Sequence, residues 1–306
     1  MNIKSNILEI IGNTPLIELT QLERYFGLES RIFAKLERNN PTGSIKDRAA
    51  KEMILSAFQK GEIDKSTAIV EPTSGNTGIS IAAICASLGL RCVIFMPSSV
   101  SIERKKLIEA LGAEIHLTNS NGGMIEAINE AKQFVLKNNN SFILSQFDNP
   151  NNSLSHYKTT GPEIYRDLDG KIDVFITSFG TGGTLSGVAK YLKEKNKNIL
   201  CYGIEPSRSS FIKERKNGIH KIQGIGAGFQ PRVLELDYID DVLTVTDEEA
   251  YEFTRLLAKK EGIFAGISSG ANVAKVVALA KKFTNKNIVT ILPDNGERCL
   301  SIDNLY

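Results

Sequence analysis

Strand-like and helical stretches alternate along most of this sequence of 306 residues. The strand-like stretches cover residues 31–37, 68–71, 91–96, 114–118, 141–144, 173–177, 199–205, 241–245 and 287–292. The helical stretches cover residues 44–60, 77–88, 101–111, 123–137, 153–167, 184–195, 247–261 and 269–283. Strands that pair in parallel need a long crossover connection, which is usually a helix. The alternation therefore predicts an α/β fold in which mostly parallel sheets are flanked by helices.

The length and charge of the chain limit what it can be. A chain of 306 residues that is 42% hydrophobic is long enough for one large or two medium domains. The Asn-rich segment at residues 149–152 is the predicted boundary between two domains. A net charge of +2 gives no strong field toward nucleic acid or a membrane surface. The sequence has neither a long apolar run nor a signal-peptide pattern after Met1, so we expect a cytoplasmic protein.

Cysteine and histidine residues give no sign of a metal site. The four cysteines do not form a C-x-x-C pair, and they are Cys85, Cys92, Cys201 and Cys299. Buried free thiols are favoured over a disulfide or a metal site. The three histidines are scattered, without metal-ligand spacing. The chain also lacks the G-x-S-x-G elbow of many serine hydrolases.

A lysine stands at the predicted start of the first long helix. Residues 39–48 read NNPTGSIKDR, in which Pro41 and Gly43 mark a turn and Lys46 falls in the first helical turn. Apolar residues follow Lys46 at i+4, i+7 and i+11, so the lysine lies on the apolar edge of its helix. The positive end of the helix dipole and the loss of water both lower the pKa of an amine. An imine-forming lysine needs a lowered pKa, although an ordinary solvated lysine is the alternative.

A glycine-rich turn follows the strand predicted at residues 173–177. The turn reads SFGTGGTLSG, and its candidate phosphate-binding residues are Gly180, Thr181, Gly182, Gly183 and Thr184. Glycine lets the backbone approach a ligand, and the threonine hydroxyls can donate hydrogen bonds. The pattern is neither G-x-G-x-x-G nor a Walker loop. It predicts a cradle for a phosphate group.

A nucleotide-binding alternative remains open for the same turn. The next predicted strand ends at Glu205, about twenty residues further on, where a dinucleotide site would place its ribose-binding acid. Pro206 follows directly, and the glycine fingerprint is broken. An NAD-binding oxidoreductase is therefore the more remote interpretation.

Two further turns lie between a strand and a helix or at the start of a helix. The segment EPTSGNTG at residues 71–78 offers hydroxyls, an amide and backbone N–H groups to a carboxylate or a small phosphate, or it is an ordinary capped turn. The segment GISSGA at residues 266–271 is an N-cap or presents a neutral hydroxyl to a ligand. A cofactor with one phosphate and one aldehyde, acting on an amino acid, would use both turns, the lysine and the cradle. That cofactor is pyridoxal 5′-phosphate (PLP).

Several longer motifs give the sequence a resemblance to a known family. They are IGNTPL at residues 11–16, the segments at residues 40–48, 72–78, 96–97, 101–104, 159–164 and 180–187, KIQGIGAGF at residues 221–229, and the segments at residues 266–271 and 296–298. With these motifs the chain resembles the cysteine synthase (O-acetylserine sulfhydrylase) family of fold-type II PLP enzymes. The resemblance implies a tryptophan synthase β-like fold with the active site in the cleft between two domains. Residues 40–150 would form a smaller, mobile domain that closes over the substrate, and residues 1–39 plus 151–306 the larger domain with the phosphate cradle.

The resemblance also implies roles for single residues. Lys46 would be catalytic and would carry the internal aldimine, Asn76 would bind the 3′-oxygen of PLP, and Ser268 would face the pyridine nitrogen. The turn at residues 180–184 would hold the phosphate. The substrate α-carboxylate would be bound by Thr73, Ser74, Gly75, Thr77 and Gln146. The loop at residues 223–228, with Gly224, would border the site of the second substrate.

The implied reaction is a β-replacement. O-acetyl-L-serine and sulfide would give L-cysteine and acetate through an α-aminoacrylate intermediate. Gln230 stands where the family usually has an aliphatic residue, which leaves open cysteine or serine as donor, with release of hydrogen sulfide or formation of lanthionine, serine or cystathionine. The family further implies a homodimer that can dock the C-terminus of serine acetyltransferase.

Overall fold

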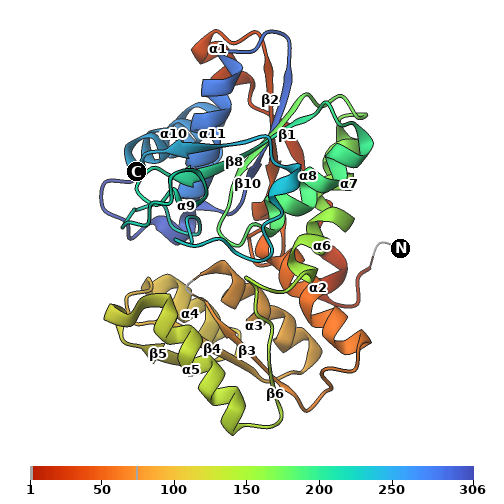
Figure 1. Cartoon of the computed structure of the whole chain (residues 1–306), viewed down its shortest axis with the longest axis vertical. Coiled ribbons are helices and arrows are strands. Elements are labelled where there is room, and N and C mark those ends of the chain that lie inside the picture. Colours follow the sequence, from red (N-terminus) through yellow and green to blue (C-terminus); the bar gives the residue numbers. More distant parts are fainter. Residues whose placement is uncertain (1–2, 74) are drawn as a thin grey trace. The chain divides into compact units, whose positions relative to one another are not determined.

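The chain divides into two compact units. The computed structural model describes residues 3–73 and 75–306. Unit 1 comprises the described residues of 1–11 and 46–152, and unit 2 comprises residues 12–45 and 153–306. Each unit contains one sheet with its own core, and the elements are labelled in Figure 1.

The N-terminal segment belongs to unit 1. The expected division assigned residues 1–39 to the larger domain as one block. Leu8 is instead buried in the core of unit 1, together with Ala49 and Ala50 of the first long helix. Lys51 of the same helix donates a hydrogen bond of 2.6 Å from Nζ to the carbonyl oxygen of Leu8. The partly buried Ile7 and Ile11 pack against the same core, and these contacts place the segment in unit 1.

Unit 2 is built on a six-stranded sheet with the strand order β1-β2-β10-β7-β8-β9 (Figure 1). Its strands are β1 (Leu16–Glu18), β2 (Arg31–Leu36), β7 (Val174–Ser178), β8 (Leu200–Pro206), β9 (Asp241–Val245) and β10 (Asn287–Leu292). β1 pairs with β2 in antiparallel orientation, and the other neighbouring strands are parallel. The parallel strands agree with the α/β prediction, whereas β1 was not expected.

Helices cover both faces of this sheet. They are α1 (Thr20–Phe26), α7 (Thr160–Asp167), α8 (Gly183–Lys195), α9 (Phe211–Glu214), α10 (Asp247–Glu261) and α11 (Ile267–Ala280), with η2 (Glu37–Asn39), η4 (Leu236–Tyr238) and η5 (Gly296–Cys299) as 3-10 turns. Successive side chains of a strand point to opposite faces. In β10, Ile288 and Leu292 join the core under α1, α10 and α11, whereas Val289 and Ile291 join the core under α7 and α8. A strand buried on both faces explains why β10 is apolar almost throughout.

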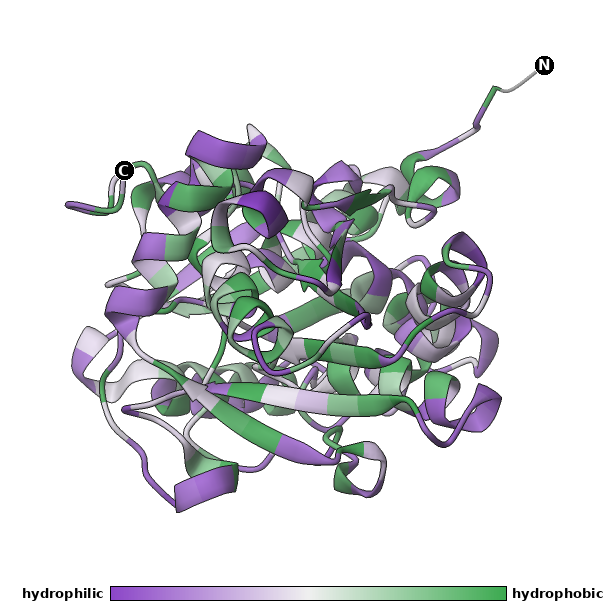
Figure 2. Ribbon diagram, turned by 90° about the horizontal axis from the view of Figure 1, so that it is seen from above, coloured by the Kyte–Doolittle hydropathy of each residue, from purple (hydrophilic) through white to green (hydrophobic). Residues whose placement is uncertain are grey.

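Unit 1 repeats this arrangement on a smaller scale. Its four-stranded parallel sheet has the order β5-β4-β3-β6 and consists of β3 (Ala68–Pro72), β4 (Cys92–Pro97), β5 (Glu114–Thr118) and β6 (Ser141–Ile143). Its helices are η1 (Ile7–Ile10), α2 (Lys46–Gln59), α3 (Asn76–Leu88), α4 (Ile102–Ala110), η3 (Ser120–Gly122) and α5 (Gly123–Lys137). Ile69 and Ile94 face α2 and α3, and Val70 and Val93 face α5. Figure 2 shows hydrophobic residues along the strands of the molecule.

One predicted helix is in fact two. The expected helix at residues 153–167 consists of α6 (Asn151–Lys158) and α7, with Thr159 between them at φ −126° and ψ −68°. Pro162 has no N–H group, so it cannot donate to the carbonyl oxygen four residues earlier. The proline therefore accounts for the break that the apolar periodicity did not indicate.

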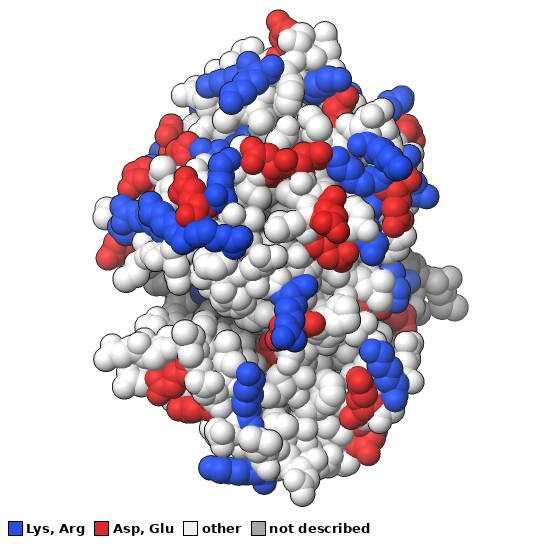
Figure 3. Space-filling model, in the orientation of Figure 1, with Lys and Arg blue, Asp and Glu red and all other residues white. Residues whose placement is uncertain are grey.

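The remaining expectations from composition concern cysteines, metals and charge. All four cysteines are free and buried, as predicted. Among the described residues there is no cluster of metal-ligating side chains, and none of the helices they form is long and apolar enough to cross a membrane. Figure 3 shows acidic and basic side chains mixed over the visible face, in keeping with a net charge of +2.

A capping box begins α10. Thr246 Oγ1 accepts a hydrogen bond of 3.1 Å from the N–H of Glu249, and Glu249 Oε2 accepts one of 2.8 Å from the N–H of Thr246. We expect Thr246→Ala to lower the free energy of unfolding of unit 2 by about 1 kcal/mol, because one helical N–H loses its acceptor. Urea denaturation would measure the change. The exposed Thr284 offers a control, and equal effects of Thr246→Ala and Thr284→Ala would show that the cap contributes nothing.

Candidate active site

Lys46 is the first residue of α2, at the position the sequence predicted. The residues four, seven and eleven positions later, Ala50, Met53 and Ala57, are buried in the core of unit 1. Lys46 therefore lies on the buried side of α2, and its side chain is only partly exposed. The neighbouring Asp47 is buried and accepts a hydrogen bond of 2.5 Å from the hydroxyl of Ser80 on α3. This bond fixes the start of α2 against α3. The lowered pKa of Lys46 remains a prediction.

The turn between β3 and α3 gathers the residues expected to bind a carboxylate. Thr73 is buried, and its Oγ1 accepts a hydrogen bond of 3.3 Å from the N–H of Gly75. Gly75 is the N-cap of α3, and Asn76 is the first residue of that helix. The Thr77 hydroxyl donates a hydrogen bond of 2.7 Å to Oε1 of Gln146. Ser74, which the sequence also predicted here, lies outside the described residues. Unit 1 thus brings Thr73, Gly75, Asn76, Thr77 and Gln146 together at one helix N-terminus.

The turn between β7 and α8 has the donors that a phosphate group needs. No described residue accepts a hydrogen bond from the backbone N–H of Gly180, Gly182 or Thr184. The N–H of Gly183 makes only a long contact of 3.4 Å with Oγ1 of Thr181. Gly182 has φ +86°, a left-handed conformation that favours glycine. Helix α8 begins at Gly183, so its positive end adds to these donors.

Close backbone approaches make glycine necessary at the edge of this turn. A Cβ atom at Gly180 would lie 2.5 Å from the carbonyl oxygen of Gly224. The N–H of Gly226 donates a hydrogen bond of 3.1 Å to the carbonyl oxygen of Phe179. The loop at residues 223–228 therefore packs directly on the cradle. Gln230 follows this loop and is exposed.

The start of α11 adds buried hydroxyl groups to unit 2. Ser268 is 6% exposed and Ser269 fully buried, both in the first turn of α11. Within the described part of the chain, the hydroxyls of Ser269 and Ser178 have no hydrogen-bond partner. Such buried polar atoms are rare and often indicate a ligand or water that completes the site.

One residue of this region was not predicted from the sequence. Asn272 of α11 is fully buried, and its Oδ1 accepts a hydrogen bond of 2.7 Å from the N–H of Ser178. Its Nδ2 donates one of 2.7 Å to the carbonyl oxygen of Ile291. Asn272 thereby fixes the end of β7, from which the cradle starts, to α11 and β10. The only signal in the sequence is an amide in a mostly apolar helix.

Each unit offers chemistry that fits PLP. Unit 2 presents free N–H groups and threonine hydroxyls for a phosphate group, and a neutral serine for a ring nitrogen. Unit 1 presents a primary amine for an aldehyde and a helix N-terminus for a carboxylate. Residues 7–294 match the family model described as "Pyridoxal-phosphate dependent enzyme". The chain belongs to this family.

Individual relatives are similar over nearly the whole chain. "Cysteine synthase B" of Campylobacter jejuni is 49% identical to this chain, and the match covers 99% of each of the two chains. The crystal structure of cysteine synthase from Entamoeba histolytica has a TM-score of 0.96 and 39% identity, over 100% of this chain and 91% of that one. The crystal structure of a hydrogen sulfide-producing enzyme from Fusobacterium nucleatum has a TM-score of 0.94 and 41% identity, over 97% of this chain and 100% of that one. The chain is thus a PLP-dependent α/β enzyme similar to cysteine synthases.

The residue on which the NAD-binding alternative depends, Glu205, is engaged in the fold. Glu205 is 2% exposed, and its two carboxylate oxygens accept hydrogen bonds of 3.0 and 3.1 Å from the N–H groups of Ile212 and Lys213. The carboxylate therefore stabilises the start of α9 and is not available to bind the hydroxyl groups of a ribose.

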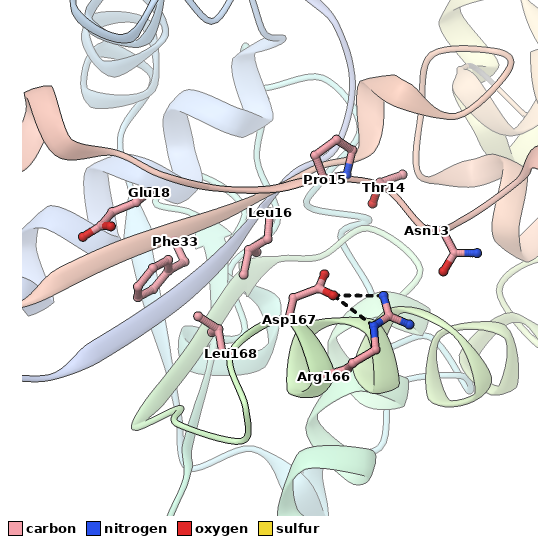
Figure 4. Close-up of a pocket in the computed structure, with 9 residues that line it drawn as sticks. All are labelled: Asn13, Thr14, Pro15, Leu16, Glu18, Phe33, Arg166, Asp167 and Leu168. Carbon is pink, nitrogen blue, oxygen red and sulfur yellow. Dashed lines mark hydrogen bonds and ion pairs between the residues drawn. The ribbon is translucent and has the colours of Figure 1, made fainter.

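A cavity of about 500 Å³ lies elsewhere on unit 2 (Figure 4). It is lined by Asn13, Thr14, Pro15, Leu16, Glu18, Phe33, Arg166, Asp167 and Leu168, none of which is a predicted site residue. Its charged groups are already paired, since Arg166 Nη2 lies 2.9 Å from Asp167 Oδ1 and Lys35 Nζ lies 3.1 Å from Asp167 Oδ2. The cavity is therefore no alternative to the cradle.

Proposed function

We propose that this protein catalyses a β-replacement in which sulfide displaces acetate from O-acetyl-L-serine and gives L-cysteine. The main support is the turn between β7 and α8, whose free N–H groups suit the phosphate of PLP, in a chain similar to cysteine synthases over its whole length. The second support is a lysine at the start of α2. Small amino acids and sulfide are accordingly the substrates.

In this proposal each site residue binds one part of the cofactor. The N–H groups and hydroxyls of residues 180–184 bind its phosphate, and Lys46 binds its aldehyde carbon through Nζ. Asn76 binds the 3′-oxygen. The Ser268 hydroxyl meets the pyridine nitrogen, and as a neutral group it does not force protonation of that nitrogen as a carboxylate would. When bound, PLP supplies an electron sink for the negative charge that develops on the substrate Cα.

The side chains of unit 1 then act on the amino acid. Thr73, Gly75, Thr77 and Gln146 bind its α-carboxylate and orient the Cα–H bond. Nζ of Lys46, which the amino group of the substrate would first displace from the aldehyde carbon, would then remove the Cα proton and later return a proton to Cα. The Cβ–O bond to acetate breaks, and a Cβ–S bond to sulfide forms. Overall, O-acetyl-L-serine and hydrogen sulfide give L-cysteine, acetate and a proton.

A second candidate reaction uses the same groups with L-cysteine as donor and releases hydrogen sulfide. The similarity to the hydrogen sulfide-producing enzyme of Fusobacterium nucleatum supports this second reaction. So does Gln230, a polar and exposed residue just after the loop at residues 223–228. Water, homocysteine or a second cysteine as acceptor would give serine, cystathionine or lanthionine.

Steady-state assays that pair each donor with each acceptor would separate these reactions. With PLP-loaded protein, we expect O-acetyl-L-serine plus sulfide to give the highest kcat/KM. Cysteine formation and sulfide release would be followed in the same reactions. A rate with L-cysteine alone that far exceeds the rate of cysteine formation would reject the first proposal in favour of the second.

The resemblance to cysteine synthases also supports two partner proposals. The protein would form a homodimer, and it would dock the C-terminus of serine acetyltransferase. Both are supported by family analogy alone.

A further inference from the structure

A buried carboxylate that the proposed chemistry does not use lies two residues before Thr73. Glu71 of β3 is 1% exposed. Its Oε2 accepts a hydrogen bond of 2.9 Å from the N–H of Ser145, and its Oε1 accepts one of 3.1 Å from the N–H of Gln146. A carboxylate can satisfy two such donors at once, whereas a neutral amide of the same size cannot. Burial raises the pKa of Glu71 to about 8, whereas hydrogen bonds from these two N–H groups and from the Gln146 side chain act in the lowering direction.

The Glu71 carboxylate accepts hydrogen bonds from the backbone N–H groups that follow the end of the pairing between β3 and β6. β6 pairs in parallel with β3 as far as Ile143, and the N–H of Leu144 still donates to the carbonyl oxygen of Val70 at 3.3 Å. Ser145 then adopts φ +57°, a left-handed conformation that is uncommon for serine. The backbone turns away from β3 at this point, and the next two N–H groups meet the side chain of Glu71. Glu71 thus holds the turned backbone in place.

Gln146, whose backbone Glu71 holds, is a predicted binding residue for the substrate α-carboxylate. Gln146 is 5% exposed, and its Oε1 accepts the hydrogen bond from the Thr77 hydroxyl. Its carbonyl oxygen accepts a hydrogen bond of 2.8 Å from Nδ2 of Asn152. The backbone of Gln146 is held at both N–H and carbonyl, its Oε1 is fixed by Thr77, and its side chain also hydrogen-bonds to Glu71. An amide NH₂ group carries two donors, so one of them remains for a substrate carboxylate.

We propose that Glu71 is a positioning residue for recognition of the substrate α-carboxylate, because it fixes the backbone of Gln146 and through it the Gln146–Thr77 pair. The inference rests on the proposed function and deepens it. Glu71 touches neither substrate nor cofactor in this role. Its loss should therefore weaken the binding of the amino acid and leave the proton transfers by Lys46 largely unchanged.

The test uses Glu71→Gln in the PLP-loaded enzyme. One of the two N–H groups loses its acceptor in this variant, so we expect the KM for O-acetyl-L-serine to rise by about tenfold or more. The kcat should change less than about threefold, and the KM for sulfide should stay the same. Hydrogen exchange of the peptide that spans residues 144–149 should become faster, with or without substrate. The visible absorption of the bound cofactor should not change.

Glu205→Gln is the matched control. Glu205 is also a buried carboxylate that accepts two backbone N–H bonds, but in unit 2 and at the start of α9. We expect it to lower stability without changing the KM for O-acetyl-L-serine. Glu71→Asp keeps both oxygens on a shorter side chain and should show a smaller rise in this KM. If Glu71→Gln does not fold, the KM of Glu71→Asp for O-acetyl-L-serine tests the proposal instead.

The outcomes distinguish this inference from the proposed function. A wild-type protein without turnover of O-acetyl-L-serine and sulfide would overturn both. Normal wild-type turnover with an unchanged KM in the Glu71 variants would overturn the inference alone. Equal rises in KM for Glu71→Gln and Glu205→Gln would also overturn it, because the effect would then be one of general stability.

Discussion

Replacement of Lys46 by alanine is expected to lower the turnover of O-acetyl-L-serine by at least about 10⁴-fold. General acid–base catalysis by one positioned side chain contributes about 10²–10⁴-fold, and Lys46 is proposed to bind the cofactor covalently as well. Without Lys46, the first turn of α2 contains no lysine that could replace it. Steady-state assays of cysteine formation would measure the loss. The visible absorption that PLP gains on binding to a lysine should disappear in the same variant.

Lys60→Ala is the control for this experiment. Lys60 is exposed and follows the last residue of α2, so its loss removes a lysine of the same segment without touching the start of the helix. We expect normal turnover and normal absorption from this variant. Substantial cysteine formation by Lys46→Ala would contradict the proposed mechanism, whatever Lys60→Ala does.

The strands that could be predicted from the sequence are those buried on both faces. β10 is apolar at almost every position because each of its faces packs against helices, and this burial leaves a pattern within the strand itself. β1 has three residues, all partly exposed, and its existence depends on antiparallel pairing with β2. No local pattern could indicate such a strand. The break at Thr159 was missed for a different reason, since apolar periodicity continued across Pro162.

The site turns were predictable because their chemistry is local. Glycines and hydroxyl residues between a strand and a helix indicate an anion-binding turn before any contact is known. The residues that fix these turns have partners far away in the sequence. Asn272 binds the N–H of Ser178, which is 94 positions away, and Glu71 binds the N–H of Ser145, which is 74 positions away. Only the folded chain brings such pairs together, so the sequence could not show which partner a buried amide or carboxylate would bind.

The second large effect is expected for the phosphate cradle. In Gly180→Ala, the new Cβ atom would lie 2.5 Å from the carbonyl oxygen of Gly224. This oxygen belongs to backbone, and the hydrogen bond between Gly226 and Phe179 ties its loop to the cradle. The turn must therefore shift by more than a few tenths of an ångström, and the N–H groups of residues 180–184 lose their common orientation. We expect the affinity for PLP to fall by about 100-fold, the loss of one or two charge-assisted hydrogen bonds.

Titration of cofactor-free protein with PLP, followed by absorption, would measure this affinity. Gly262→Ala serves as the control, because Gly262 ends α10 in the same unit at φ +67° with no atom within 4 Å of a new Cβ. That variant should lose stability through backbone strain and still bind PLP normally. A Gly180→Ala protein that binds PLP as tightly as the wild type would show that the phosphate does not depend on this turn. The assignment of residues 180–184 to the cofactor would then have to be abandoned, even if Lys46 proved essential.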